Sequence, residues 1–284
     1  MKLISFLNQG VPSYGVVTGD DVLDLTPILG AQAPDLKTLI AKNLFGAVAK
    51  ATKTHKPTLK FSQLTLQPVI PNPGQIFCIG LNYGEHVRET GREVTETPVI
   101  FLRLTDSQVA HGQDIVRPPE SHRLDYEAEI AVIIGKGGRR IREEDAWDHI
   151  AGYSCYNDGS VRDWQRHTTQ FTPGKNFVGT GAFGPILVTR GEIADGEELS
   201  LTTRLNGQVM QHATTAMLIF PIPRLIEYVS TFTHLAPGDV IVSGTPGGVG
   251  ARRQPPVWMK EGDLVEIEVS KIGVLRNRVE REKL

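Results

Sequence analysis

Short apolar runs separated by polar turns dominate the hydrophobic pattern of this chain, and they predict many strands and few helices. Residues 76–80 and 99–102 are continuous apolar runs that are typical of buried strands. Asn206-Gly207 separates two further runs, 201–205 and 208–212, and this dipeptide is a strong signal for a two-residue hairpin turn. The pattern therefore indicates a sheet-rich fold.

The most informative strand is expected at residues 125–135, where two glutamates precede a run of apolar residues. Successive side chains of a strand point to opposite faces, so Glu127 and Glu129 would emerge on one side and Ala128 on the other. Two carboxylates aimed into one space repel each other, and a hard divalent cation would remove that penalty. A solvated strand face is the alternative that this motif alone leaves open.

The first part of the chain predicts a small unit of its own. Polar turns at residues 8–10 and 18–21 separate short alternating segments, which we expect to be strands. Apolar residues then recur at helical spacing and predict one helix through Leu36, Leu39, Ile40 and Leu44. A polar stretch follows, and three prolines near residue 70 mark a boundary. We therefore divide the chain into a small N-terminal accessory domain, residues 1–68, and a main domain, residues 69–284.

The main domain predicts one longer helix and further strands. A proline near the start of 223–232 suits the first turn of a helix. Strands are expected at 239–243 and 264–270, the second continuing as a hairpin. Two long stretches, 104–124 and 157–182, follow neither a helical nor a strand period, and loops of such length are often functional. The predicted fold class is β-rich α+β.

Composition is that of a soluble globular protein. The chain has 284 residues, a formal net charge of −2 and 40% hydrophobic residues, which is enough for a substantial core. The near-neutral charge gives no indication of a nucleic-acid partner. Cys78 and Cys155 are the only cysteines, which excludes a disulfide scaffold and favours a reducing cytoplasm. No apolar run approaches the roughly 20 residues that cross a bilayer, so we expect a cytoplasmic protein without a membrane partner.

Four motifs, in order along the chain, together resemble the fumarylacetoacetate hydrolase family. They lie at residues 79–83, 125–129, 157–165 and 243–250. The N-terminal part resembles the accessory domain of short bacterial members of the acylpyruvase type. The resemblance implies that the main domain is a mixed β-sheet roll and that the protein is a homodimer.

In that family, two glutamates of an E-x-E strand and an aspartate of an N-D segment hold a divalent cation. The resemblance therefore implies Glu127, Glu129 and Asp158 as metal ligands. Oxygen ligands with open positions for substrate favour Mg²⁺ or Mn²⁺, with Ca²⁺ as the alternative. Some members have a fourth acidic ligand where this chain has Ile79, which favours the two smaller ions. Considered alone, Asp158 is more typical of a turn-forming residue before Gly159 than of a metal ligand.

His86 and Glu89 are the predicted catalytic pair. On a short helix these two residues would share one face, and a neighbouring carboxylate gives a histidine the basicity and orientation that a general base needs. Family members that cleave their substrates have such a pair on a lid. Gly84 and Gly91 bracket the segment, which is compatible with a movable lid. An exposed helix with polar contacts along one face is the alternative.

The resemblance implies further polar residues around the substrate. Arg162 and Gln165 would bind substrate oxygens, and Lys175 would be a catalytic group that stabilises developing negative charge. Thr245 lies in a glycine-rich loop whose amides and hydroxyl could receive a substrate carboxylate. Considered singly, the first three residues are compatible with surface side chains, and the loop is compatible with a tight turn.

These features lead to the hypothesis of a metal-dependent hydrolase that cleaves a carbon–carbon bond in a 3-acylpyruvate or related 1,3-dicarbonyl acid, such as fumarylpyruvate or maleylpyruvate. The metal would hold the 2-oxo-acid end as an enolate, while His86 activates water. Three alternatives stay open. They are a decarboxylase of the oxaloacetate type, an isomerase or hydratase of unsaturated 2-oxo acids, and a non-catalytic protein that binds 2-oxo acids.

Overall fold

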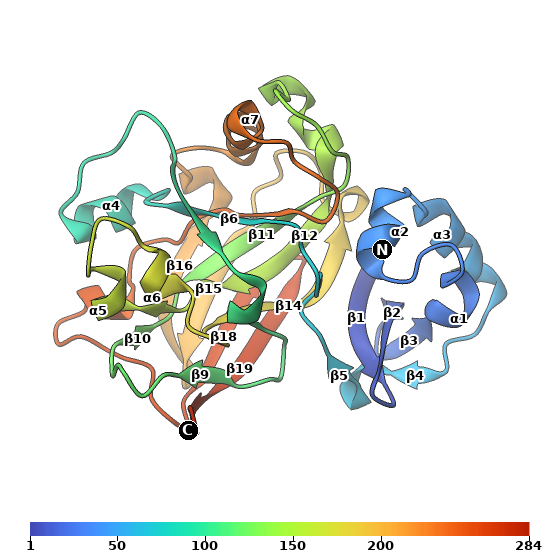
Figure 1. Cartoon of the computed structure of the whole chain (residues 1–284), viewed down its shortest axis with the longest axis horizontal. Helices are drawn as coiled ribbons and strands as arrows, with labels where there is room; N and C mark the ends of the chain where they lie inside the picture. Colours follow the sequence, from blue (N-terminus) through green and yellow to red (C-terminus); the bar gives the residue numbers. More distant parts are fainter. Residues whose placement is uncertain (284) are drawn as a thin grey trace.

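The computed structural model describes residues 1–283 and shows two large β-sheets and a small two-stranded one, with helices arranged around them (Figure 1). Twelve strands form a large mixed sheet, which confirms the predicted β-rich α+β class. From one edge to the other, this sheet consists of β4 (Leu59–Lys60), β3 (Asp21–Asp24), β2 (Val11–Thr18), β1 (Lys2–Asn8), β14 (Gly181–Thr189), β12 (Ile150–Asn157), β11 (Ala128–Ile134), β17 (Val240–Val242), β6 (Ile76–Gly80) and β7 (Val99–Arg103). In addition, β5 (Thr65–Leu66) pairs with β1, and β8 (Gln108–Val109) pairs with β14.

A second sheet of five strands contains the predicted hairpin. Its order is β16 (Gln208–Thr214), β15 (Ser200–Leu205), β18 (Leu264–Val269), β19 (Gly273–Arg281) and β9 (Ile115–Arg117). Asn206 and Gly207 join β15 to β16 with φ values of 52° and 81°, the positive values that a two-residue hairpin turn of this kind needs. A separate two-stranded ladder pairs β10 (Leu124–Asp125) with β13 (Ser160–Val161).

Strand β11 is buried on both faces because both sides of the large sheet are covered. Ile130 and Val132 belong to a core shared with Leu201 of β15, whereas Ala131 and Ile133 face a second core that includes the N-terminal helices. This two-sided burial explains the continuous apolar run in the sequence. Each fully buried valine or isoleucine contributes about 1.5–3 kcal/mol, so the strand next to the two glutamates is firmly held.

The N-terminal part contains three short helices where the sequence predicted one. They are α1 (Thr26–Leu29), α2 (Leu36–Ala41) and α3 (Phe45–Thr54). The prediction of a single helix through Leu44 was wrong because Asn43 adopts a left-handed backbone conformation, with φ 51°, between α2 and α3. Helix α3 was missed because it buries only Val48 and Ala51, which leaves a weak apolar signal.

Strand β1 joins the N-terminal part to the rest of the molecule. It pairs with β14, with Lys2 opposite Val188 and Leu3 opposite Leu187. The large sheet therefore continues across the boundary that the prolines suggested. The division of the chain after residue 68 stays a prediction.

The remaining predicted elements correspond to β6, β7, β17, β18, β19 and α7 (Ile222–Phe232), all of which are present. The two long stretches without periodicity contain elements too short to show a period, among them β8, β9, β13, α5 (Arg162–Gln165) and α6 (Thr172–Lys175). The 3-10 helices are η1 (Phe61–Gln63), η2 (Thr105–Ser107), η3 (Glu143–His149), η4 (Arg190–Glu192), η5 (Thr215–Met217) and η6 (Gly250–Arg252). Both cysteines are buried and free. Among residues 1–283, no helix has the length and apolar character needed to cross a membrane.

Helices α4 (Gly84–Thr90), α5 and α6 gather at one end of the molecule, far from α1, α2 and α3 (Figure 1). The motifs at residues 79–83 and 157–165 meet there. The candidate site lies at this end.

Candidate active site

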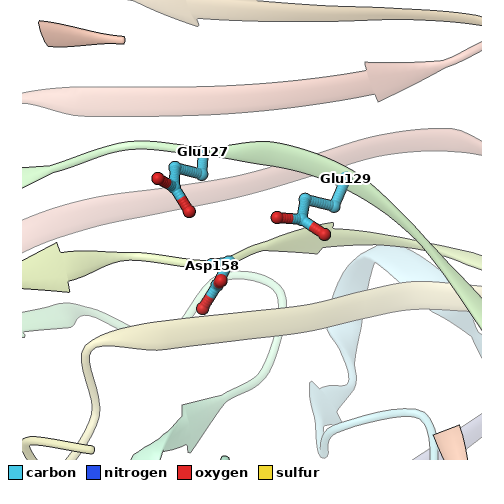
Figure 2. A group of neighbouring side chains, drawn as sticks. All are labelled: Glu127, Glu129 and Asp158. Carbon is cyan, nitrogen blue, oxygen red and sulfur yellow. The ribbon is translucent and has the colours of Figure 1, made fainter. Parts of the chain in front are cut away.

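Three carboxylates from two neighbouring strands meet where β11 begins and β12 ends. Glu127 directly precedes β11, Glu129 is its second residue, and Asp158 follows β12, which pairs with β11 in antiparallel register. The Asp158 amide donates to the Glu127 carbonyl oxygen at 2.9 Å, which keeps the two residues adjacent. Figure 2 shows the three carboxylates directed toward a common space. One oxygen from each carboxylate lies within 4.8 Å of the others.

Burial makes this cluster suited to a cation. Glu127, Glu129 and Asp158 are 4%, 1% and 0% exposed. Burial raises the pKa of Glu129 well above its ordinary value, and the charges of Asp158 and Glu127 raise it further. Burial also opposes ionisation of Glu127, but Arg162 and Lys175 outweigh it and lower the pKa of that carboxyl. A doubly charged cation would relieve the repulsion, and an all-oxygen donor set fits a hard ion such as Mg²⁺ or Mn²⁺.

Three buried cations surround the carboxylates. Lys175 Nζ lies 2.5 Å from Glu127 Oε2 and 2.6 Å from Asp158 Oδ2. Arg103 Nη1 lies 2.5 Å from Asp158 Oδ1, and Arg162 Nη1 lies 2.7 Å from Glu127 Oε1. Lys175 and Arg162 were predicted to belong to the site, whereas Arg103 was not. Its signal in the sequence was a single charge at the end of an apolar run.

Asp125 fixes the position of Arg162. Its Oδ2 accepts from Arg162 Nε at 2.7 Å and from the Ala251 amide at 2.9 Å, and its Oδ1 accepts from the Gly250 amide at 2.8 Å. Arg162 Nη1 also donates to Gln165 Oε1 at 3.0 Å, so the two predicted substrate-binding residues contact each other. Within residues 1–283, Arg162 Nη2 has no hydrogen-bond partner, which leaves a buried donor available for a ligand.

The predicted pair of His86 and Glu89 forms on α4. His86 Nδ1 lies 2.7 Å from Glu89 Oε1, and the other Glu89 oxygen accepts from the Gly248 amide at 2.9 Å. His86 is 7% exposed, which contradicts the alternative of an exposed helix face. Because Nδ1 faces a carboxylate oxygen, we assign the proton to Nδ1, and Nε2 is then the nitrogen that can accept one.

The glycine-rich loop that contains Thr245 is fixed by a residue that the sequence did not indicate. Buried Gln211 on β16 donates from Nε2 to Thr245 Oγ1 at 2.9 Å. The preceding residue, Gly244, donates its amide to Glu129 Oε2 at 2.5 Å. Gly244 has φ 102°, and a Cβ at this position would lie 2.6 Å from Asn82 Cβ, so the loop requires glycine here. The signal for Gln211 was a polar residue within a hairpin strand.

Most of the side chains predicted to form the active site line one pocket. The predicted residues that line it are His86, Glu127, Glu129, Arg162, Gln165, Lys175 and Thr245. Glu89 and Asp158 contact this lining from behind, through His86 and Lys175. The wall also contains residues that the sequence did not indicate, among them Phe101, Phe171, Arg92, Arg166 and Arg252. Such a pocket, with carboxylates at its base and cations beside them, suits a small anionic molecule that also contacts a metal.

The chain belongs to the fumarylacetoacetate hydrolase family. The family model described as "Fumarylacetoacetate (FAA) hydrolase C-terminal" matches residues 75–280. The mitochondrial oxaloacetate tautomerase FAHD2A of Bos taurus is 38% identical over 291 residues, with 98% of this chain and 91% of the relative covered. Oxaloacetate tautomerase YisK of Bacillus subtilis is 42% identical over 223 residues, covering 77% of this chain and 74% of the relative.

A solved structure extends this similarity to the whole chain. The maleylpyruvate hydrolase from Sphingobium sp. SYK-6, in complex with manganese(II) ion and pyruvate, has a TM-score of 0.83 and 28% identity, with 100% of both chains covered. The predicted family is confirmed, and the chain is an enzyme of that family. The buried acidic cluster and this manganese-containing relative both point to a divalent metal.

Proposed function

We propose that this enzyme catalyses the keto–enol tautomerisation of oxaloacetate with a divalent cation as its cofactor. The observation that carries the proposal is the pocket in which Glu127, Glu129 and the base His86 lie together, with Asp158 directly behind. The similarity to two oxaloacetate tautomerases over most of the chain supports this choice of reaction.

Each charged group of the pocket has a part in binding the substrate. Glu127, Glu129 and Asp158 would hold the cation, which when bound polarises a carbonyl oxygen in contact with it. Arg162 offers Nη2 to a substrate carboxylate, because its other donors are already paired within the site. Lys175 places a buried positive charge beside the carboxylates, where negative charge develops on the substrate oxygen.

His86 supplies the base. Tautomerisation of the keto form removes a proton from C3 and places a proton on the C2 oxygen, so that the double bond moves from carbon–oxygen to carbon–carbon. His86 Nε2 can accept the C3 proton, and Glu89 at Nδ1 stabilises the imidazolium that results. No water molecule is consumed, which distinguishes this reaction from hydrolysis.

The test follows the decay of the oxaloacetate enol with Mg²⁺ or Mn²⁺ present. We expect a metal-dependent acceleration that falls about 10²-fold or more in His86→Ala, because in this direction the His86 imidazolium returns the proton to C3 and general acid–base catalysis typically contributes this much. Metal affinity of the variant should stay the same, since His86 is not among the carboxylate ligands. Unchanged turnover together with intact metal binding would rule out His86 as the base. Release of carbon dioxide would identify a decarboxylase.

Hydrolysis of a 3-acylpyruvate is the second candidate. The full-length structural similarity to a maleylpyruvate hydrolase favours it, as does a His86–Glu89 pair that could orient a water molecule. An assay with acetylpyruvate, fumarylpyruvate and maleylpyruvate separates the two candidates, because hydrolysis splits each substrate into two organic acids and tautomerisation leaves its carbon skeleton intact. Binding of oxaloacetate and of these acids without turnover of any of them would indicate a non-catalytic protein.

A further inference from the structure

Three arginines from separate segments line the outer part of the pocket. Arg92 follows α4, Arg166 follows α5, and Arg252 ends η6. All three are exposed, whereas the carboxylates at the base of the same pocket are buried. The pocket therefore leads from a buried acidic base to a mouth that contains these arginines, which we name the mouth arginines.

The mouth arginines lack the carboxylate partners that the inner cations have. Arg103, Arg162 and Lys175 each form a salt bridge in the interior. Across the described part of the chain, residues 1–283, no aspartate or glutamate lies within salt-bridge distance of a mouth arginine. Partial burial and then the positive charges of Arg252 and Arg162 lower the pKa of Arg166, and the charge of Asp125 opposes them only in part, so like charges are crowded here. An anion would relieve this crowding.

A row of aromatic contacts links one mouth arginine to the base of the pocket. The Arg92 guanidinium lies 5.2 Å from the centre of the Phe171 ring. Phe171 packs edge-to-face on Phe101, with 5.7 Å between ring centres, and Lys175 Nζ lies 4.9 Å from the Phe101 ring centre. One continuous wall therefore has a cation at each end.

The side-chain donors at the mouth remain largely available. Arg252 Nη2 donates to the Thr90 carbonyl oxygen at 3.3 Å, at the end of α4. Among residues 1–283 the Arg92 side chain contacts the Phe171 ring and donates no hydrogen bond, so its N–H groups are available to a ligand. A guanidinium can bind a carboxylate through two parallel hydrogen bonds, which a lysine cannot do.

We propose that Arg92, Arg166 and Arg252 form a second anion site, which binds the distal carboxylate of a 2-oxo diacid whose oxo-acid end lies at the base of the pocket. This inference rests on the proposed function, because it assumes that the metal and Arg162 bind the oxo-acid end. The mouth arginines then determine specificity: they select diacids over monoacids of the same length and take no part in the proton transfer.

The test compares matched ligands by calorimetric titration into the full-length protein with Mn²⁺. The diacids 2-oxoglutarate and 2-oxoadipate are each compared with the monoacid of equal chain length, 2-oxopentanoate and 2-oxohexanoate. We expect at least one diacid to bind about tenfold or more tightly than its monoacid, the effect of one charge-assisted hydrogen bond or more. The double variant Arg166→Gln, Arg252→Gln should lose this preference while its monoacid affinity changes less than about twofold.

Arg88→Gln is the matched control. Arg88 is an exposed arginine of α4 that lies outside this pocket, beside Tyr83 and Glu85. Its replacement should preserve the diacid preference. The three substituted arginines are exposed, so equal unfolding midpoints of all variants would verify that they fold.

Two results would overturn the inference. One is equal affinity of the wild type for each diacid and its monoacid, and the other is a diacid preference that survives in the double variant. Failure of the proposed function looks different, because the decay of the oxaloacetate enol would then not be accelerated, whatever the affinities for diacids and monoacids. The preference should also weaken as salt is added, since the mouth arginines are exposed to solvent.

Discussion

Glu129 is the residue at which the site holds its most unfavourable charge. Burial and two neighbouring carboxylates raise its pKa, and its oxygen accepts from the Gly244 amide without a direct cation partner. Without metal, the unfolded chain ionises Glu129 near the ordinary value of 4.5, while the folded protein resists ionisation. The stability of the metal-free protein should therefore decrease as the pH rises above that value.

Glu129→Gln should remove this pH-dependent penalty and retain an acceptor for the Gly244 amide. We predict that the variant gains stability relative to the metal-free wild type as the pH rises, by up to about 1.4 kcal/mol per pH unit above the ordinary pKa of glutamate. Urea unfolding in the presence of a chelator, from about pH 5 to pH 8, measures this difference. A difference that stays constant with pH would contradict the assigned repulsion.

Asp125, unlike Glu129, stabilises the site, because its buried carboxylate accepts hydrogen bonds from Arg162 and from backbone amides. Asp125→Asn keeps the shape but removes one of the two buried carboxylates that pair with the Arg162 guanidinium, and Glu127 remains as the other. Because breaking a buried ion pair costs about 3–5 kcal/mol when no other partner remains, and Glu127 still pairs with Arg162, we predict a loss of free energy of unfolding of up to about that size, measured by urea unfolding. Asp163→Asn is the control, since Asp163 accepts from Ser121 Oγ and an asparagine oxygen can do the same. Equal losses in both variants would count against a special role of Asp125.

The sequence indicated residues of the site wherever a motif was local. Glu127 and Glu129 are two positions apart on one strand, so their shared direction follows from strand geometry alone. Arg103 meets Asp158 across 55 positions, and Gln211 meets Thr245 across 34, so each contact depends on how distant strands are ordered in the sheets. The mouth arginines come from three separate segments for the same reason. The local pattern of apolar and polar residues therefore cannot predict these long-range contacts.

Helix α4 depends on contacts outside itself. It has seven residues, and an isolated helix of this length is unstable in water. Glu89 connects it to the glycine-rich loop, because one oxygen accepts from Gly248 while the other faces His86. Glu89 therefore both orients the base and attaches the helix over the pocket.

Glu89→Gln can maintain only one of these two acceptor contacts, because the second oxygen becomes an amide donor. We predict faster amide exchange at Val87 and Gly91, whose N–H groups bond within α4, and turnover reduced by up to about 10²-fold through misplacement of His86. Hydrogen exchange followed by mass spectrometry measures the first effect. Glu85→Gln, an exposed change on the same helix, should alter neither quantity. Unchanged exchange in Glu89→Gln would show that Glu89 does not attach α4 to the loop.

At the level of elements, the sequence predicted strands better than short helices. Two-sided burial gives β11 an unmistakable apolar run. Asn206-Gly207 marks the hairpin of β15 and β16 because few other residues tolerate that backbone. Leu44 at the start of α3 continues the helical spacing of the apolar residues in α2, so the two helices gave one apparent helix, and α1 buries only Leu29 and was not predicted. The boundaries of these helices are set by how the N-terminal part packs on the large sheet. The periodicity of apolar residues carries no information about that packing.

At the level of the whole molecule, the site exists only when both sheets are assembled. Its residues come from the central strands β11 and β12, from β7 and from the loop after β17, with Gln211 of the second sheet holding that loop. In the unfolded chain these residues are far apart and cannot surround one ion. A cation that binds this cluster should therefore bind the folded state alone and stabilise it.

We predict that Mn²⁺ at about 100 times its dissociation constant stabilises the folded protein by about 2.7 kcal/mol, which corresponds to a rise in unfolding midpoint of roughly 5 °C for a chain of this size. Differential scanning fluorimetry with Mn²⁺ or a chelator measures the shift. Glu129→Gln is the matched control because it removes one carboxylate ligand without leaving any buried lysine or arginine unpaired. The variant should be at least as stable as the metal-free wild type near neutral pH, yet its midpoint should barely respond to Mn²⁺. An equal response in both proteins would mean that the ion stabilises the fold from some other place, and the carboxylate cluster would then lose its assignment as the metal site.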